Sequence, residues 1–346
     1  MLALFIVLLV AQESVDSAMR LAAVGRVDEA GGVLRRLVEQ NPQDADLRYR
    51  LGLIQLKQKQ LDLAVATLNQ ATRLAPRMAM AWLALAEAHL RQGRRTAALA
   101  DAQHAEVQAG ASAPAWKALA FLAARTGDAA AQGRALEALL RLEPQERAPY
   151  AQLASLRLDR REAELARRVA DAALARFPGD AEFLRLRGLS LYALGRKPEA
   201  IDTFLAAMDG APGNDLVHAS IETLLPDAGD RLPKIRERLE RFEISQPVSP
   251  LGPFLLALVS TEDAERNLRK SLERDPRFWP AWFELSKVLR DPAERRQALE
   301  QTLTLNQNHE GAHFALAQLY LDQGDAEKAR LHRAAHHRLR QAASAK

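Results

Sequence analysis

Residues 79–105 read AMAWLALAEAHLRQGRRTAALADAQHA, and this stretch decides the fold. Its apolar residues recur at spacings of three and four on both sides of Gly93, which is typical of two amphipathic helices joined by a tight turn. Stepping outward from it by 34 residues in either direction gives the same pattern again. No single helix pair of this size can bury its apolar face alone, so the sequence predicts a stack of helical hairpins.

Four columns of the 34-residue alignment carry the pattern through six consecutive units. The first column contains small residues, and the second contains alanine in all units but one. The third column marks the turn between the two helices, and the fourth marks the end of the second helix. The columns are, in that order, Ala18, Gly52, Ala86, Ala120, Ala154 and Gly188; Ala30, Ala64, Ala98, Gln132, Ala166 and Ala200; Gly25, Lys59, Gly93, Gly127, Arg161 and Gly195; and Pro42, Pro76, Gly110, Pro144, Pro178 and Pro212. Large residues stand beside the small column, namely Leu51, Leu85, Leu119 and Leu153, with Trp82, Trp116, Tyr150 and Leu184 as a further set. Small residues let helix axes approach closely, and the large ones fill the flanking gaps.

These columns resemble the tetratricopeptide repeat, a family of 34-residue helix–turn–helix units with a W…L-G…Y…A…F…A…P pattern. The likeness is clearest in residues 79–105 and in residues 182–212, EFLRLRGLSLYALGRKPEAIDTFLAAMDGAP. It implies an all-α, right-handed α-solenoid of about ten units, irregular around residues 226–253, where five prolines break the phase.

The expected organisation has four parts. Residues 1–11 form an apolar, signal-like segment, and residues 12–214 form six regular repeats. Residues 215–253 form a degenerate unit and a proline-rich junction. Residues 254–346 form three further repeats with a basic C-terminal helix, in which no carboxylate follows Glu327.

Composition excludes several classes of protein. Hydrophobic residues are 48% and charged residues 27%, the balance of a folded, non-fibrous chain. The absence of cysteine excludes disulfides, thiolate zinc sites and a cysteine nucleophile. The formal net charge is only +4. A groove that binds nucleic acid normally carries a strong basic stripe, so the low charge argues against nucleic acid as a partner.

The N-terminal run Met1–Ala11, MLALFIVLLVA, has the length of a secretory h-region and is too short to span a bilayer. No lysine or arginine precedes it. We expect export to an extracytoplasmic compartment, the periplasm or the exterior. The alternative is an apolar first helix of a cytoplasmic protein. Membrane association is expected, if at all, through this segment or the basic C-terminal helix.

One motif suggests chemistry. His309-Glu310-Gly311-Ala312-His313 is a literal H-E-x-x-H, the zinc-binding pattern of metalloproteases. The repeat phase opposes that interpretation, because His309 falls before the helix and His313 falls in the Trp82 column. His332, His336 and His337 are expected to be solvated on the last helix. We therefore predict no catalytic residue, no metal site, no cofactor and no enzymatic activity, a zinc-dependent hydrolase being the lesser alternative.

The family resemblance implies that the first helices of the units line a groove that binds a ligand. The residues expected there are Tyr49, Leu53, Lys57, Leu83, Glu87, Arg91, Lys117, Phe121, Arg125, Arg185, Leu189 and Tyr192. Lys57, Arg91 and Arg125 would form a cationic ladder suited to an extended acidic peptide. The expected function is a protein-interaction scaffold, in the assembly of bacterial envelope or secretion machinery. Helical-repeat RNA binding is a second hypothesis.

Overall fold

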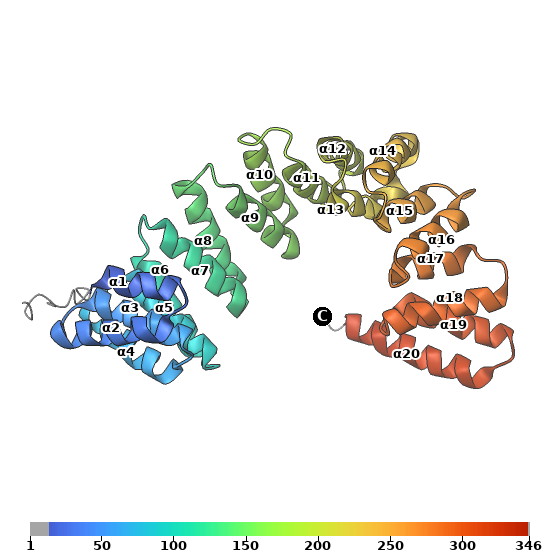
Figure 1. The fold of residues 1–346 in the computed structure, drawn as a ribbon. Helices are drawn as coiled ribbons and strands as arrows, with labels where there is room; N and C mark the ends of the chain where they lie inside the picture. The colour runs from blue at the N-terminus through green and yellow to red at the C-terminus, as the bar shows by residue number, and fades with distance from the viewer. Residues whose placement is uncertain (1–13, 345–346) are drawn as a thin grey trace, which may run out of the picture. The chain divides into compact units, whose positions relative to one another are not determined.

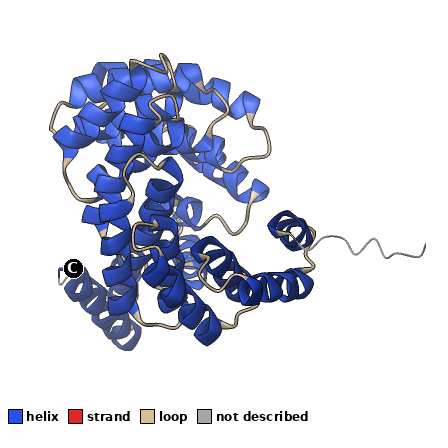
Figure 2. Ribbon diagram, turned by 90° about the vertical axis from the view of Figure 1, so that its left-hand side faces the viewer, coloured by secondary structure: helices blue, strands red, loops and turns tan. Residues whose placement is uncertain are grey.

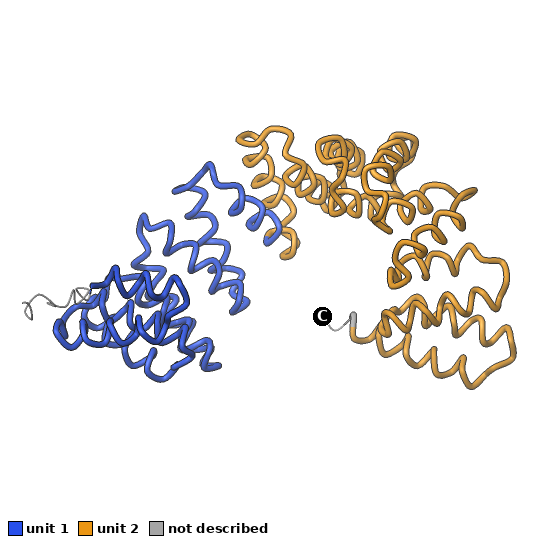
Figure 3. Tube along the Cα trace, in the orientation of Figure 1, with its two compact units in different colours: residues 1–156 blue, residues 157–346 orange. Residues whose placement is uncertain are grey.

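The computed structural model describes residues 14–344, and within that range it contains helices and loops without a β-strand (Figure 2). The chain divides into two compact units, residues 1–156 and 157–346 (Figure 3). The division falls inside a helix of the regular repeats and not at the proline-rich junction. The signal-like segment Met1–Ala11 lies outside the described residues. No described helix is both long enough and apolar enough to cross a bilayer.

Unit 1 is a stack of antiparallel helical hairpins (Figure 1). Its helices are α1 (Val15–Ala23), α2 (Val27–Gln40), α3 (Ala45–Lys57), α4 (Leu61–Leu74), α5 (Ala79–Arg91), α6 (Arg95–Gln108), α7 (Ala113–Thr126), α8 (Ala129–Leu142) and the larger part of α9 (Arg147–Asp159). Several of them begin at a polar cap: the Asp44 carboxylate accepts hydrogen bonds from the N–H groups of Asp46 and Leu47, at 2.9 and 3.0 Å.

Unit 2 continues the pattern with one irregular stretch. Its elements are α10 (Ala163–Leu174), α11 (Ala181–Ala193), α12 (Lys197–Gly210), α13 (Asp215–Ala219), two 3-10 turns (Glu222–Asp227 and Gly229–Arg231), α14 (Leu232–Ser245), α15 (Leu251–Val259), α16 (Ala264–Arg274), α17 (Trp279–Val288), α18 (Pro292–Leu305), α19 (Glu310–Asp322) and α20 (Ala326–Ser344). Each unit has the architecture of an all-α helical-repeat solenoid.

The turn column explains where the first helix of each hairpin ends. Glycines at this position have positive φ, for example 77° at Gly93 and 76° at Gly195. Lys59 and Arg161 stand in the same column with φ of 60° and 59°, a conformation that costs a non-glycine residue about 1–2 kcal/mol. The repeat geometry therefore imposes the left-handed turn even where the sequence does not supply glycine.

The small column marks where a first helix meets the second helix of its own hairpin. Gly52 and Gly188 are buried, and a Cβ atom on them would lie 2.5 Å from the Leu68 side chain and 2.6 Å from the Phe204 ring. Leu68 and Phe204 are themselves fully buried. In these two hairpins a large residue on one helix packs where the other helix has no side chain.

The tryptophan column has a second role besides packing. The indole N–H groups of Trp82, Trp116 and Trp282 each donate to the backbone carbonyl six residues earlier, all at 2.9 Å. Tyr150 donates to the carbonyl six residues before it, at 3.3 Å. Each of these side chains ties the loop that precedes its helix.

The irregular stretch between α12 and α15 keeps the hydrophobic core of unit 2 continuous. Val217, Ile221 and Leu224 are buried with Leu239 of α14 and Phe254 of α15 in one cluster. Its prolines lie in a 3-10 turn, in the loop after α14, or at the first positions of α14 and α15, where a missing N–H costs nothing. The segment is degenerate as a repeat but remains part of the stack.

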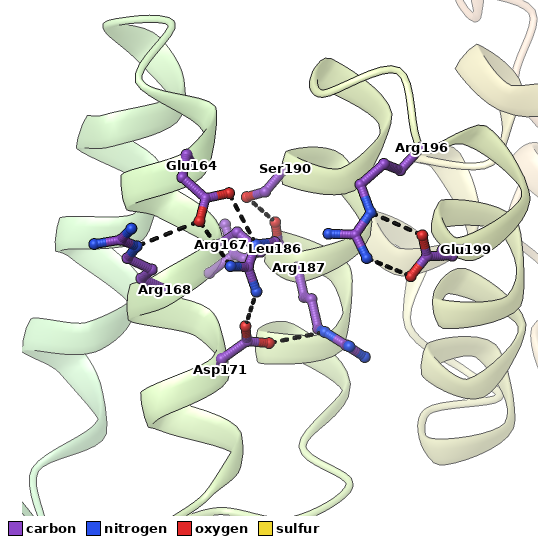
Figure 4. A network of polar contacts seen from close by, with 9 residues as sticks. All are labelled: Glu164, Arg167, Arg168, Asp171, Leu186, Arg187, Ser190, Arg196 and Glu199. Carbon is purple, nitrogen blue, oxygen red and sulfur yellow. Dashed lines mark hydrogen bonds and ion pairs between the residues drawn. The ribbon is translucent and has the colours of Figure 1, made fainter.

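An ion network links α10 and α11 at a position where the preceding repeats carry leucine (Figure 4). Arg187 occupies the position that Leu153 holds one unit earlier, and its Nε lies 2.8 Å from the Asp171 carboxylate. Asp171 also pairs with Arg167, which bonds to Glu164 at 2.7 Å. The Arg167 hydrogen bond, aided by Arg168, lowers the pKa of Glu164 to about 2. An ion network therefore replaces part of the hydrophobic seam at this point.

Candidate functional site

Six of the twelve expected groove residues line one cavity of about 270 Å³ in unit 1. It lies among α3, α5 and α7, the first helices of three successive hairpins. The lining residues are Tyr49, Leu53, Leu56, Met80, Leu83, Ala84, Glu87, Arg91, Ala118, Phe121 and Leu122. The wall is mostly apolar, and its charged groups are Glu87 and Arg91. We name it cavity A.

A second cavity, of about 540 Å³, lies among α7, α8 and α9. It is lined by Lys117, Ala120, Phe121, Ala124, Gln132, Leu139, Glu146, Ala148, Pro149 and Gln152. We name it cavity B. Phe121 lines both cavities and remains 64% exposed, an unusual position for a large aromatic ring unless something covers it.

The cationic ladder is partly neutralised. Arg91 pairs with Glu87 at 2.6 Å, and Arg125 pairs with the other oxygen of the same carboxylate. The Arg125 guanidinium also lies 5.5 Å from the centre of the Phe121 ring. Lys57 is exposed at the end of α3 and lines neither cavity. Glu87, Arg91 and Arg125 together carry a charge of +1, so the ladder is not the row of free positive charge that the sequence predicted.

The rim of cavity B carries the opposite charge. Lys117 pairs with Glu143 at 2.6 Å, and Glu146 lies in the lining beside it. The hydrogen bond that Lys117 donates to Glu143 raises the pKa of Lys117, and the charges of Glu143 and Glu146 add to that effect. Sequence reasoning missed both glutamates because they lie in the loop before α9 and not on a first helix. The Glu87–Arg125 pair could have been found from the sequence, because the two residues are 38 positions apart, which is one repeat of 34 plus one helical turn of about four residues.

The three expected site residues of unit 2 take different positions. Arg185 is only 9% exposed and pairs with Glu182 in its own helix at 2.9 Å. The expectation that it faces a ligand is therefore wrong. Leu189 and Tyr192 are half-buried against the core of unit 2. The Tyr192 hydroxyl donates to Asp227 at 3.3 Å.

The histidines of the H-E-x-x-H motif have structural partners. His309 precedes α19 and caps it, since its Nδ1 accepts the N–H of Ala312 at 3.0 Å. His313 lies 3.0 Å from the Gln307 carbonyl six residues earlier, so its Nε2 donates as the tryptophans of this column do. The two imidazoles are thus not a pair on one helix face. Among residues 14–344 no three side chains of the metal-binding types are grouped to hold an ion.

His332 departs from the expected solvated position. Its Nδ1 lies 2.9 Å from Nδ1 of His313, and its ring stacks on Tyr320. Because Nε2 of His313 donates to a carbonyl, neutral His313 accepts at Nδ1, and His332 is the donor. His336 is half-buried beside Phe314, and His337 is exposed.

Comparison with known proteins agrees with this architecture. The family description "Tetratricopeptide repeat" matches residues 15–76, 60–114 and 151–215. Yeast Tom70 is 14% identical with a TM-score of 0.50, over 92% of this chain and 89% of that one. The APC/C hetero-tetramer Cut9–Hcn1 gives 12% identity and a TM-score of 0.48, over 93% and 92%. YrrB, described as a TPR protein with an unusual peptide-binding site, gives 15% and 0.45, over 55% and 97%.

No curated protein sequence matches the chain. At these identities the structural likeness concerns the fold alone. The matched repeats, the left-handed turn column and the buried small column lead to one conclusion: the chain belongs to the tetratricopeptide-repeat family.

Proposed function

We propose that this chain is a non-enzymatic scaffold whose unit 1 binds an extended segment of a partner protein along cavities A and B. The tetratricopeptide-repeat fold supports a protein-interaction role in general. The observation that supports this particular site is Phe121, a large ring 64% exposed between two mostly apolar cavities. Burying such a ring against a ligand would contribute about 1.5–3 kcal/mol.

A matched pair of substitutions tests this site. Phe121→Ala removes the shared wall, and Leu63→Ala removes another exposed apolar side chain, 53% exposed on α4, outside both cavities. We expect Phe121→Ala to weaken binding of partner-derived peptides at least tenfold, measured by fluorescence anisotropy, and Leu63→Ala to leave it unchanged. Equal effects of the two substitutions would refute the assignment.

We further propose that the partner belongs to an envelope or secretion assembly and that the chain acts outside the cytoplasm. The apolar run Met1–Ala11 supports export. Cell fractionation with N-terminal sequencing of the native protein tests the proposal. A cytosolic protein that retains Met1 would refute it.

A further inference from the structure

Phe121 divides the binding region into two compartments that one ligand can occupy together. Cavity A lies on one side of the α7 helix and cavity B on the other, and the ring contributes to both walls. Cavity A has a volume of about 270 Å³ and can admit a large apolar side chain. Cavity B, at about 540 Å³, has room for a large apolar side chain and for parts of the residues next to it in the peptide. Two side chains of one segment could therefore enclose the exposed ring between them.

The spacing of those side chains follows from helix packing. Cavities A and B lie on successive steps of the first-helix row, and packed helices are about 8–10 Å apart. An extended chain in the polyproline II conformation advances about 3.1 Å per residue with three residues per turn, so residues i and i+3 lie on one face about 9 Å apart. Two side chains that reach neighbouring compartments are therefore about three residues apart.

The charges at the two rims have opposite sign. Beside cavity A, the pair of guanidinium groups of Arg91 and Arg125 exceeds the single carboxylate of Glu87 by one charge. Beside cavity B, the carboxylates of Glu143 and Glu146 exceed the single ammonium of Lys117 by one charge. Both groups are partly exposed, so they act on a ligand at the rim and not in the apolar interior.

We propose that the ligand of unit 1 is an extended peptide segment with two large apolar side chains about three residues apart, one in each cavity, flanked by an acidic residue at the cavity A end and a basic residue at the cavity B end. This inference rests on the proposed function. It differs from the extended acidic peptide that the sequence predicted, because it adds a basic residue beside Glu143 and Glu146, which lie next to Lys117.

Synthetic peptides on the full chain test the proposal. The probes are fluorescein-labelled peptides with two leucines three positions apart, flanked by one glutamate and one lysine, by two glutamates, or by two lysines. The mixed peptide satisfies both rims in one direction of binding, with its glutamate at the cavity A end and its lysine at the cavity B end. We expect it to bind about fivefold to tenfold more tightly than either uniformly charged peptide, with the difference reduced at high salt. Moving the two leucines of the mixed peptide to adjacent positions should lower its affinity, because they can no longer reach both cavities.

A charge reversal in the protein sharpens the test. Glu146→Lys converts the net charge of Lys117, Glu143 and residue 146 at the cavity B rim from −1 to +1, and Glu146 is exposed in the loop before α9. We expect this variant to prefer the peptide with two glutamates. Glu39→Lys, on the exposed surface of α2, makes the same change in net charge and should keep the preference for the mixed peptide.

The possible failures are distinguishable. If peptides bind with the expected sensitivity to Phe121→Ala but the two-glutamate peptide binds as well as the mixed one, the inference fails and the proposed function stands. If binding is insensitive to Phe121→Ala, or no peptide binds up to ~1 mM, the proposed function fails with it. An unchanged preference in Glu146→Lys would also overturn the inference.

Discussion

Adding one methyl group at Gly188 tests the packing rule on which the stack depends. The new Cβ would lie 2.6 Å from Cε2 of Phe204, whereas ordinary contacts begin at 3.4 Å, so the ring or the helix must move by about 0.8 Å. Phe204 is fully buried and has little freedom to move. Overpacking of this kind costs about 1–3 kcal/mol. The helix gains about 1 kcal/mol when alanine replaces glycine, so Gly188→Ala should destabilise unit 2 by up to about 2 kcal/mol.

Gly32→Ala is the matched control. Gly32 also lies in a helix, α2, but its added Cβ would meet only the end of the flexible Arg36 side chain, at 3.7 Å. This change should stabilise α2 by about 1 kcal/mol, since only the propensity term remains. In a Phe204→Ala background, Gly188→Ala should lose most of its cost, because alanine leaves room for the added Cβ, whereas a leucine at the equivalent position, Leu68, would lie 2.5 Å from a Cβ on Gly52.

Native-state hydrogen exchange is the suitable assay, because repeat arrays can open locally and a single global midpoint would average over the units. The free energy of opening is read from the amides of α11 and α12 for Gly188→Ala and from those of α2 for Gly32→Ala. If Gly188→Ala stabilises its helix as Gly32→Ala does, or if Phe204→Ala brings no relief, the packing rule is wrong.

Three further changes should have measurable effects. Lys59→Gly and Arg161→Gly should each raise the free energy of unfolding by about 0.5–1 kcal/mol, because glycine adopts the observed positive φ without strain. The gain should be visible as a higher midpoint of urea unfolding. Arg187→Leu should leave stability unchanged or raise it, whereas Asp171→Ala should lower it by about 1 kcal/mol, since it leaves neighbouring guanidinium groups unpaired. Acidification should loosen the α19–α20 hairpin: burial, with a smaller contribution from the neighbouring histidine, lowers the pKa of His332 below its ordinary 6.5. The unfolded chain then binds the proton more tightly, so stability is full above about pH 6.5 and falls as the pH drops below it, as hydrogen exchange of α20 would show.

Each of these predictions has a control. Gly93→Ala, in the same turn column with φ of 77°, should destabilise, and a gain would contradict the argument from Lys59. High salt should reduce the effect of Asp171→Ala if the ion network causes it. His332→Gln should flatten the acid response of α20, while His337→Gln, at an exposed position of the same helix, should not. An equal response in the two variants would remove His332 as the titrating group.

The fold could be predicted because the repeat fixes backbone geometry at few positions and repeats it. A period of 34 residues located the turns at Gly93 and Gly195 and also at Lys59, where the residue type gives no such signal. The repeat pattern of the last unit placed His313 in the tryptophan column, although His313 follows Trp282 by 31 residues and not 34, and the Nε2 hydrogen bond of His313 confirms that placement. Column position carries this information because each unit meets neighbours of the same kind.

The charges of the site could not be predicted in the same way. Long side chains choose partners across units, and their choice depends on rotamers that no period encodes. Arg185 was expected at the surface, yet Glu182 one turn earlier holds it down against the core. Glu143 reaches Lys117 from a loop whose course follows from the packing of α8 and α9. Cavity walls are therefore easier to predict from repeats than the sign of the charge around them.

The bond from the tryptophan column to the carbonyl six residues earlier has a consequence for how such a chain can grow. In the hairpins that begin with α5, α7, α9 and α17, both bonding groups come from the same short stretch, so no other hairpin is needed to complete the tie. A duplicated or deleted gene segment of one period would carry the tie with it intact. Arrays of this kind can thus change length by whole periods during evolution without redesign of the connecting loops.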